Sequence, residues 1–251
     1  MNLPRSESFE PRLLASLRQA QRVVVMTGAG ASAESGVPTF RDAQTGLWAN
    51  FKPEELATAD AFRRNPKRVW EWYAWRREQV RAVEPNAGHF ALAALAKRFR
   101  EFTLITQNVD GLHQRAGSKR VLELHGNITR VKCFDEDIAI PEWSETGEAP
   151  PRCPRCRGYL RPDVVWFGEE MPDHEMREAM RATSACDVFL SIGTSSVVYP
   201  AAMFPEVALR VGATVVEINS EETPLTPVAT FSVRGASGIM LPALACAAGF
   251  A

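Results

Sequence analysis

Runs of consecutive apolar residues, each about as long as one β-strand, recur along the chain and predict its sheet. The first is Val23-Val24-Val25-Met26, and it leads into Thr27-Gly28. Continuous apolarity, in place of alternation with polar residues, indicates strands that are buried on both faces of a parallel sheet. Similar runs, rich in Val, Ile and Phe and followed by Gly, Asn or Ser, lie at Phe102–Thr106, Asp187–Ile192 and Thr214–Ile218.

Segments with helical periodicity lie between these runs. Residues 9–20 place Leu13, Leu14 and Leu17 on one face, as an amphipathic helix does. Further helices are predicted at 87–98 and 173–185. Strands that alternate with helices predict an α/β domain with a doubly wound parallel sheet.

Two stretches interrupt this alternation. Residues 45–84 are rich in aromatic residues and contain no strand-like run, which predicts a helical insertion. Residues 131–162 are rich in Pro, Glu and Arg and hold three cysteines, which predicts a small module stapled by a metal ion.

The composition narrows the possible functions. The 251 residues include 45% hydrophobic and 24% charged residues, and 29 Lys and Arg balance 30 Asp and Glu. A net charge of −1 gives no field toward nucleic acid or a membrane. The N-terminus lacks the apolar core of a signal peptide, and no run approaches the roughly 18 apolar residues of a membrane span. Five cysteines with a single Cys-x-x-Cys suit reduced thiols and a metal, so a cytoplasmic location is expected.

A glycine turn follows the first predicted strand. Residues 28–33, Gly-Ala-Gly-Ala-Ser-Ala, fit G-x-G-x-x-A, in which glycines let backbone N–H groups approach a pyrophosphate. The alternative is a turn that only closes a strand–helix connection. A dehydrogenase would end its second strand in Asp or Glu about 20 residues later. Residues 46–51 are no strand, so hydride transfer is disfavoured.

Five blocks of sequence together resemble the sirtuin family, and they occur in the family order over most of residues 23–220. The blocks are GAGASAESGVPTFRD at 28–42, TQNVDGLHQRAG at 106–117, LHG at 124–126, VVWFGE at 164–169 and GTSSVVYPAA at 193–202. The resemblance implies a reaction in which NAD and an acylated protein lysine give nicotinamide, free lysine and acyl-ADP-ribose. It also implies a Rossmann-like NAD-binding domain (1–44, 85–130 and 163–251) and a small domain (45–84 with a zinc-ribbon-like module, 131–162).

The resemblance assigns roles to residues that match the family blocks. Gln107, Asn108 and Asp110 would line the nicotinamide pocket, where Asp110 can accept a hydrogen bond from the carboxamide; alternatively Asn108 and Asp110 only form a turn and a helix cap. Phe40 would cover the ribose and Arg41 would meet phosphate or orient its loop. The other expected NAD contacts are Gly28, Ala29, Gly30, Ser32, Ala33, Glu34, Gly193, Thr194, Ser195, Asn219, Ser220, Glu221 and Ala236.

The same resemblance makes His125, in Leu124-His125-Gly126, the general base that takes a proton from the ribose. Histidine is the side chain whose ordinary pKa lies close to working pH. The other three histidines have structural explanations. His89 opens a helix, His113 follows the Gln-Asn-Val-Asp turn, and His174 lies at a polar helix start.

Two groups of residues are expected to contact the acylated lysine. Val164–Glu169 resembles the strand that pairs with the substrate backbone, with Val165, Phe167 and Gly168 at the acyl-lysine; the alternative is an ordinary edge strand. Tyr73 and Arg76 lie on one helix face and match a Tyr-x-x-Arg pair of the bacterial class III subgroup, which removes succinyl and malonyl groups. Alternatively, Tyr73 packs in an amphipathic helix and Arg76 is solvated.

The family's zinc site appears with one substitution. Cys153 and Cys156 form an intact Cys-x-x-Cys, but the first pair reads Cys133-Phe134-Asp135-Glu136, so Glu136 stands in place of the fourth thiolate. Three thiolates and a carboxylate could hold structural zinc, or the module could fold with zinc partly or wholly absent. Cys186 and Cys246 are expected in the core.

Three functions are compatible with the sequence. The first is an NAD-dependent deacylase for acetyl and acidic acyl groups on protein lysines. The second is a sirtuin-type mono-ADP-ribosyltransferase, and the third is a non-catalytic NAD- or ADP-ribose-binding module. His125 with Tyr73 and Arg76 favours the first over the second, and Asn108, Asp110 and His125 together speak against the third.

Overall fold

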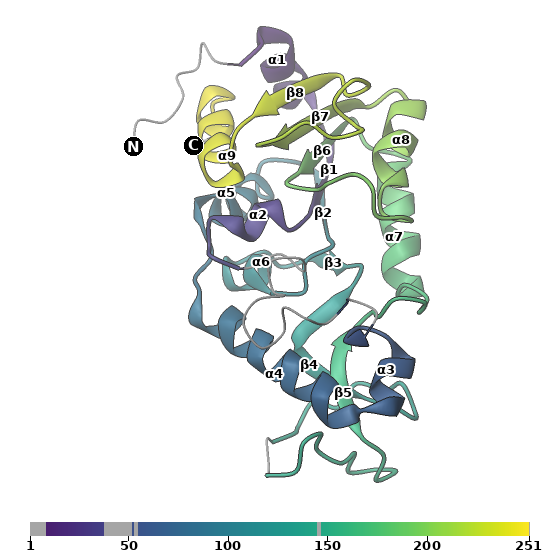
Figure 1. Ribbon diagram of the computed structural model, residues 1–251. Helices are drawn as coiled ribbons and strands as arrows, with labels where there is room; N and C mark the ends of the chain where they lie inside the picture. The colour runs from purple at the N-terminus through teal and green to yellow at the C-terminus, as the bar shows by residue number, and fades with distance from the viewer. Residues whose placement is uncertain (1–8, 38–51, 53–54, 145–146, 251) are drawn as a thin grey trace.

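The computed structural model describes residues 9–37, 52, 55–144 and 147–250. A six-stranded sheet lies at the centre, and a smaller unit of α3, α4, β4 and β5 lies below it in Figure 1. The strand order is β3-β2-β1-β6-β7-β8, and all pairings are parallel. The strands are β1 (Arg22–Thr27), β2 (Glu101–Thr106), β3 (Val121–Glu123), β6 (Val188–Ile192), β7 (Thr214–Asn219) and β8 (Phe231–Arg234).

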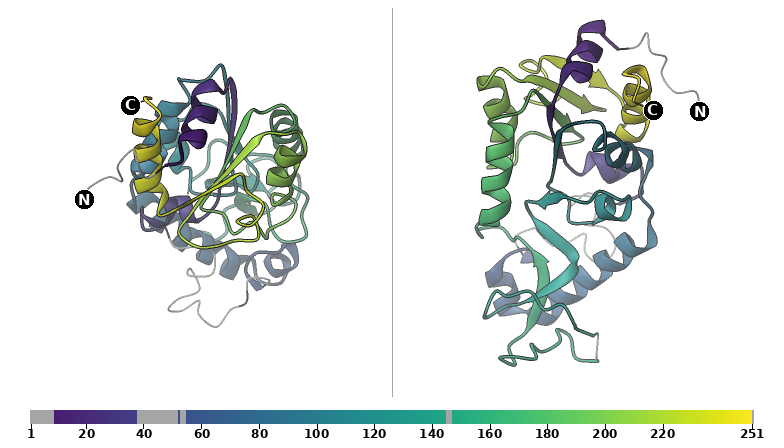
Figure 2. Two further views of the ribbon diagram at one scale, coloured as in Figure 1. Left: turned by 90° about the horizontal axis from the view of Figure 1, so that it is seen from above. Right: turned by 180° about the vertical axis from the view of Figure 1, so that it is seen from behind.

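Helices cover both faces of this sheet, as the view from above in Figure 2 shows. Val23 and Val25 face a core formed with α1 (Pro11–Gln19), α5 (Ala87–Leu95) and α9 (Ser237–Ala247). Val24 and Met26 face the opposite core, formed with α7 (Asp173–Thr183) and α8 (Met203–Arg210). One strand therefore supplies both cores, which explains its unbroken apolar sequence and confirms the doubly wound α/β class.

The chain order places a topological switch between β1 and β6. From β1 the chain builds outward to β2 and β3, and later returns to the other side of β1 with β6, β7 and β8. Open α/β sheets bind ligands at the carboxyl ends of strands beside such a switch. The short helices α2 (Gly30–Ala33) and α6 (Leu112–Arg115) follow β1 and β2 at that edge.

The smaller unit packs two helices on a two-stranded antiparallel sheet. It consists of α3 (Ala59–Arg64), α4 (Pro66–Ala82), β4 (Gly126–Cys133) and β5 (Leu160–Val164). Thr58 caps α3 by accepting from Ala61 N (3.1 Å), and Asn65 caps α4 by accepting from Arg68 N (3.1 Å). Aromatic residues of the insertion form most of its core: Phe62, Trp72 and Tyr73 pack with Trp166, Ile128 and Val164.

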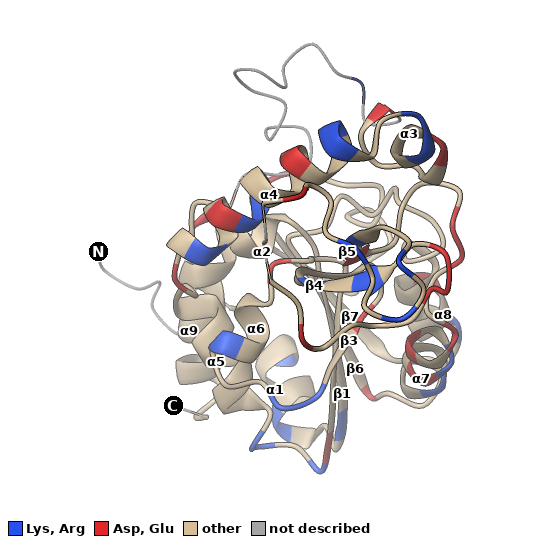
Figure 3. Ribbon diagram, turned by 90° about the horizontal axis from the view of Figure 1, so that it is seen from below, with Lys and Arg blue, Asp and Glu red and all other residues tan. Residues whose placement is uncertain are grey.

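Charges of both signs lie along α4, where Lys and Arg alternate with Glu, and on α7 (Figure 3). Intrahelical ion pairs such as Lys67–Glu71 (3.8 Å) and Glu178–Arg181 (2.8 Å) account for part of this pattern. The alternation agrees with the near-zero net charge. Among the described residues, no helix has the length and apolarity that a membrane crossing requires.

Two expectations from the sequence differ from the structure. β5 ends at Val164, and residues 165–169 form a turn in place of the expected strand, because the Glu169 carboxylate accepts a hydrogen bond from Trp166 N (2.8 Å). Cys186 is buried as expected, but Cys246 is exposed. On α9, Cys246 continues the i, i+4 row of Gly238 and Pro242, which is less buried than the row facing the sheet.

Candidate active site

The glycine turn after β1 lies directly against the turn after β6. Gly28 N donates to Ile192 O (3.0 Å), and Gly30 N donates to Gly193 O (2.8 Å). A Cβ on Gly30 would lie 2.8 Å from Gly193 Cα, and one on Gly193, whose φ is +58°, would lie 2.4 Å from Ala31 N. Contact between the two turns therefore requires glycine at these positions. This packing requirement is separate from any role of the glycines in binding a nucleotide.

A buried polar network connects this turn with the residues that follow β2. Asn108 Nδ2 donates to Gly28 O (3.0 Å) and to Ser32 Oγ (3.1 Å), and Ser32 Oγ donates to Asp110 Oδ2 (2.7 Å). Asp110 Oδ1 also accepts from Leu112 N (2.9 Å), the first residue of α6, although the N-cap position itself is Gly111. The network holds one buried carboxylate at the switch point.

Two histidines lie behind this network. His89 and His113 are both buried, their ring centroids lie 4.7 Å apart, and His113 Nε2 is 2.9 Å from Thr27 Oγ1. Burial, with a smaller effect of His89, lowers the pKa of His113 to about 3. Burial also lowers the pKa of His89, although Asp110 opposes that shift. Neither ring offers a base in contact with solvent, in line with the structural explanations given from the sequence.

The ends of β2, β6, β7 and β8 are tied together beside the glycine turns. Gln107 Nε2 donates to Thr194 Oγ1 (2.9 Å), and Asn219 Nδ2 donates to Thr194 O (2.9 Å). Gly235 N, before Ala236, donates to Asn219 O (3.0 Å). The structure thus brings the expected NAD contacts after these strands to one edge, with exposed side chains at Ala29, Ala33, Ser195, Ser220 and Glu221.

Glu34 reaches across from α2 to the start of α9. Its Oε2 accepts a hydrogen bond from Gly238 N (2.5 Å). An acidic side chain at a helix N-terminus stabilises the helix dipole. Glu34 therefore has a structural role, which the sequence did not reveal. Phe40 and Arg41 lie outside the described residues.

His125 lies between β3 and β4, close to the end of β2. Its Nδ1 is 2.8 Å from Gln107 O. A carbonyl oxygen only accepts, so Nδ1 carries the proton and Nε2 carries the lone pair. Burial lowers the pKa of His125, and the bond to Gln107 O opposes the shift. The ring is thus a neutral base in a fixed tautomer.

The backbone of His125 also holds the segment expected to meet the substrate. His125 O accepts from Val165 N (2.9 Å), and Phe167 N donates to Ala57 O (2.9 Å). Phe167 is 56% exposed, and Gly168 follows it with a φ of +85°. The turn therefore presents a large apolar side chain to solvent, two residues after the one bonded to the histidine.

Tyr73 and Arg76 lie on α4, where their surroundings differ. Tyr73 is 3% exposed and its Oη accepts a hydrogen bond from Trp166 Nε1 (3.0 Å). The Arg76 guanidinium lies 5.0 Å from the Trp72 ring. Burial lowers the pKa of Arg76, and electrostatic interactions with Tyr73 and Asp110 oppose this shift. Arg76 is therefore partly buried, not solvated.

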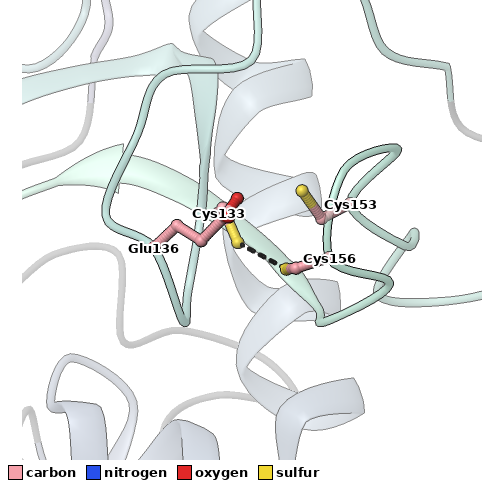
Figure 4. Close-up of side chains that lie close together, drawn as sticks. All are labelled: Cys133, Glu136, Cys153 and Cys156. Atoms are coloured by element: carbon pink, nitrogen blue, oxygen red, sulfur yellow. Dashed lines mark hydrogen bonds between the residues drawn. The ribbon is translucent and has the colours of Figure 1, made fainter.

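The four expected metal ligands converge in the small unit (Figure 4). The ligand atoms of Cys133, Glu136, Cys153 and Cys156 all lie within 4.8 Å of one another, and Cys133 Sγ is 3.4 Å from Cys156 Sγ. Tetrahedral zinc with bonds of about 2.3 Å separates its sulfur ligands by roughly 3.8 Å. The cluster fits zinc, and Glu136 also pairs with Arg155 (3.3 Å).

Trp166 is the residue whose part in this site the sequence did not indicate. It reads as one more apolar residue of the block 164–169, yet it bonds to Tyr73, 93 positions earlier. The indole N–H of a buried tryptophan usually has a hydrogen-bond partner. This general tendency is the signal that the sequence offers for Trp166, and it does not identify Tyr73 as the partner.

Comparisons with known proteins agree with this arrangement. The model of the Sir2 family matches residues 28–200. An NAD-dependent protein deacylase of Pseudomonas putida is 48% identical over 249 residues, covering 96% of this chain and 95% of that protein. One from Aquifex aeolicus is 52% identical over 220 residues, covering 86% and 92%.

Solved structures agree as well. A Sir2 homologue in complex with NAD is 43% identical, covers 97% of this chain and 96% of its own, and has a TM-score of 0.90. A Sir2 variant with a deacetylated peptide and 3'-O-acetyl ADP-ribose is 32% identical, covers 93% and 96%, and has a TM-score of 0.80. The chain belongs to the Sir2 family.

Proposed function

We propose that this protein is an NAD-dependent protein-lysine deacylase that releases nicotinamide, free lysine and O-acyl-ADP-ribose. One observation carries the proposal: the same edge of the sheet holds a neutral, oriented His125 and the buried Asn108–Ser32–Asp110 network. The names of the relatives, NAD-dependent protein deacylase, support it.

The nicotinamide end of NAD would lie at Asp110, with Gln107 and Asn108 beside it. Asp110 keeps lone pairs beyond the two that accept from Ser32 and Leu112, so it can also accept from a carboxamide NH₂. Its negative charge would also stabilise the positive charge that develops on the ribose as the glycosidic bond breaks.

The remaining NAD contacts would follow the strand ends. Gly28–Glu34 and Gly193–Ser195 would hold the phosphates and the nearer ribose, Asn219–Glu221 the adenosine ribose, and Ala236 the adenine. Phe40 and Arg41 complete this proposed set by family resemblance. Backbone N–H groups in glycine turns suit pyrophosphate because they approach it closely without a side chain.

His125 would act after nicotinamide has left. By then the acyl oxygen would have bonded to ribose C1' in place of nicotinamide. The Nε2 lone pair would take the proton of the ribose 2'-hydroxyl, directly or through the 3'-hydroxyl, so that this oxygen attacks the acyl carbon; the lysine amine then leaves and water releases O-acyl-ADP-ribose. Val165, Phe167 and Gly168 would hold the acylated lysine, because Val165 is bonded to the His125 carbonyl.

Tyr73 and Arg76 would extend the substrate range to acyl groups that end in a carboxylate, such as succinyl and malonyl. Arg76 supplies a positive charge, and Tyr73 supplies a hydroxyl donor. A neutral acetyl group would still be accepted, because the pair adds an attraction and no steric barrier. Protein lysines that carry these acyl groups are therefore the proposed partners, without nucleic acid.

Cys133, Cys153, Cys156 and Glu136 would hold a structural zinc ion. Zinc would join the turn after β4 to the loop before β5 and so stabilise the small unit. The free thiols suit a reducing compartment, which supports a cytoplasmic location.

One assay tests the proposal. Protein and NAD are incubated with matched acetyl-lysine and succinyl-lysine peptides, and nicotinamide and O-acyl-ADP-ribose are measured by mass spectrometry. We expect both products with both peptides, a rise in the succinyl KM in Arg76→Met, and no acyl-ADP-ribose in His125→Ala. Formation of ADP-ribosylated protein without O-acyl-ADP-ribose would favour the ADP-ribosyltransferase, and no nicotinamide with either peptide would favour the non-catalytic module.

A further inference from the structure

We infer that Trp166 is a positioning residue for acidic acyl groups, because its indole N–H fixes the Tyr73 hydroxyl as a hydrogen-bond donor toward the acyl carboxylate. The inference rests on the proposed function, in which Tyr73 and Arg76 recognise the acyl group. It adds a residue, and a way of acting, that neither the sequence blocks nor the comparisons assign.

The direction of the hydrogen bond follows from the chemistry of the two groups. Trp166 Nε1 lies 3.0 Å from Tyr73 Oη, and an indole N–H can only donate. Tyr73 therefore accepts and keeps its own proton for another partner. In the described part of the chain, this is the one hydrogen bond found at Tyr73 Oη.

Burial makes this arrangement specific. Tyr73 is 3% exposed and Trp166 is 2% exposed, so water competes little for either group. Burial raises the pKa of Tyr73 to about 12, which keeps the phenol protonated at neutral pH. A carboxylate can only accept, and a protonated phenol with one lone pair already occupied is well suited to donate to it.

The indole ring is itself held by side-chain contacts and by a hydrogen bond at its backbone. The Arg161 guanidinium lies 3.3 Å from the Trp166 ring, and Phe62 packs with a centroid distance of 5.4 Å. Glu169 accepts from Trp166 N (2.8 Å) and from Arg161 (2.5 and 2.9 Å). These contacts fix the position of Nε1 and, through it, the Tyr73 hydroxyl.

Trp166 also lies between the two residues expected to hold the acylated lysine. Val165 N is bonded to His125 O, and Phe167 N is bonded to Ala57 O. The same short turn therefore positions the lysine side chain and the group that would recognise its acyl end. A purely structural alternative is that the bond only attaches α4 to this turn.

The test uses Trp166→Phe, which removes the N–H and keeps an aromatic ring. We expect the KM for a succinyl-lysine peptide to rise about fivefold, the size of one hydrogen bond. Its kcat, and both constants for the matched acetyl-lysine peptide, should stay within about twofold. In a Tyr73→Phe background, Trp166→Phe should add no further change to the succinyl KM.

Trp70→Phe is the matched control. Trp70 lies on α4 and is buried like Trp166, but it packs against Trp143 and the Arg77 guanidinium. It should leave the acyl preference unchanged. If Trp166→Phe does not fold, β-(3-benzothienyl)alanine at 166 replaces the N–H by sulfur at nearly constant shape. It should likewise raise the KM for the succinyl-lysine peptide and leave the constants for the acetyl-lysine peptide unchanged.

The outcomes separate this inference from the proposed function. Equal losses of activity with both peptides in Trp166→Phe would overturn the positioning role and leave the proposed deacylase intact. Activity of the wild-type protein on the acetyl-lysine peptide alone would have the same two consequences. No nicotinamide release by the wild-type protein with either peptide would overturn the proposed function itself.

Discussion

Gly193 offers a quantitative test of how the two turns at the switch point pack. Its φ is +58°, and a Cβ there would lie 2.4 Å from Ala31 N and 2.6 Å from Gly30 C. A left-handed backbone costs a residue with a Cβ about 1–2 kcal/mol. Overpacking against backbone atoms that cannot rotate away adds about 1–3 kcal/mol. Gly193→Ala should therefore lower the free energy of unfolding by about 2–5 kcal/mol.

Gly212, which follows α8, separates the two contributions. Its φ is +81°, but a Cβ there would meet no atom within 4 Å. Gly212→Ala should therefore cost only the backbone contribution, about 1–2 kcal/mol. The two variants carry the same chemical change, so the difference between them measures the contact between the turns.

Urea unfolding gives the two free energies, and steady-state kinetics with varied NAD gives a second reading. Because Gly193 lies where the cofactor is proposed to bind, its substitution should also raise the KM for NAD, whereas Gly212→Ala should leave that KM unchanged. Equal destabilisation by the two substitutions would show that the turns are not pressed together. An unchanged KM for NAD in a destabilised Gly193→Ala would separate the packing from the cofactor site.

Three further predictions concern the base, the metal and the buried ion pair. Because burial lowers the pKa of His125 from 6.5 and the base must be neutral, kcat/KM should fall on the acid side with a midpoint below 6.5; a midpoint at or above that pH contradicts the assignment. Glu136→Cys should slow the transfer of zinc to a chelator and Glu136→Ala should speed it, both followed with a metal-sensitive dye; identical rates would show that residue 136 is not a ligand. Glu169→Gln should lower the free energy of unfolding, measured in urea, by about 2–3 kcal/mol, less than the roughly 3–5 kcal/mol of a fully buried pair, because Glu169 is partly exposed. A loss under about 0.5 kcal/mol would mean that Arg161 finds another partner.

The sheet could be predicted from the sequence where one strand serves two cores. The run at 23–26 is apolar throughout because Val23 and Val25 face one core and Val24 and Met26 the other. The edge strands β3 and β8 gave no such signal, since every residue of β3 is only partly buried and β8 is buried at one position. Continuous apolarity reports burial on two faces, so strands at an edge lack it.

The convergence of the candidate site residues could be predicted where short blocks follow strand ends, and a local feature was missed where a single long-range contact decides it. Gly28, Asn108 and His125 belong to blocks that follow strand ends, and the parallel sheet brings such ends together. The turn at 165–169 was expected as a strand, because nothing in the sequence shows that the Glu169 side chain would accept from Trp166 N. The bond from Trp166 to Tyr73 spans 93 positions, beyond any local periodicity.

The two-stranded sheet of the small unit explains how a metal can matter to chemistry that it does not touch. In the β4–β5 ladder Gly126 pairs with Val164 at one end, and Cys133 pairs with Leu160 at the other. His125 and Val165 adjoin the first end, and the proposed zinc ligands surround the second. Because β4 bulges between Asn127 and Val131, only four residue steps of β5 separate the partners of Gly126 and Cys133. At about 3.3 Å per residue the two ends of the ladder lie roughly 13 Å apart, still too far for a metal-bound water to reach the ribose. Zinc would therefore affect catalysis by keeping the two strands paired, and that pairing holds Val165 against the carbonyl of His125, the proposed base.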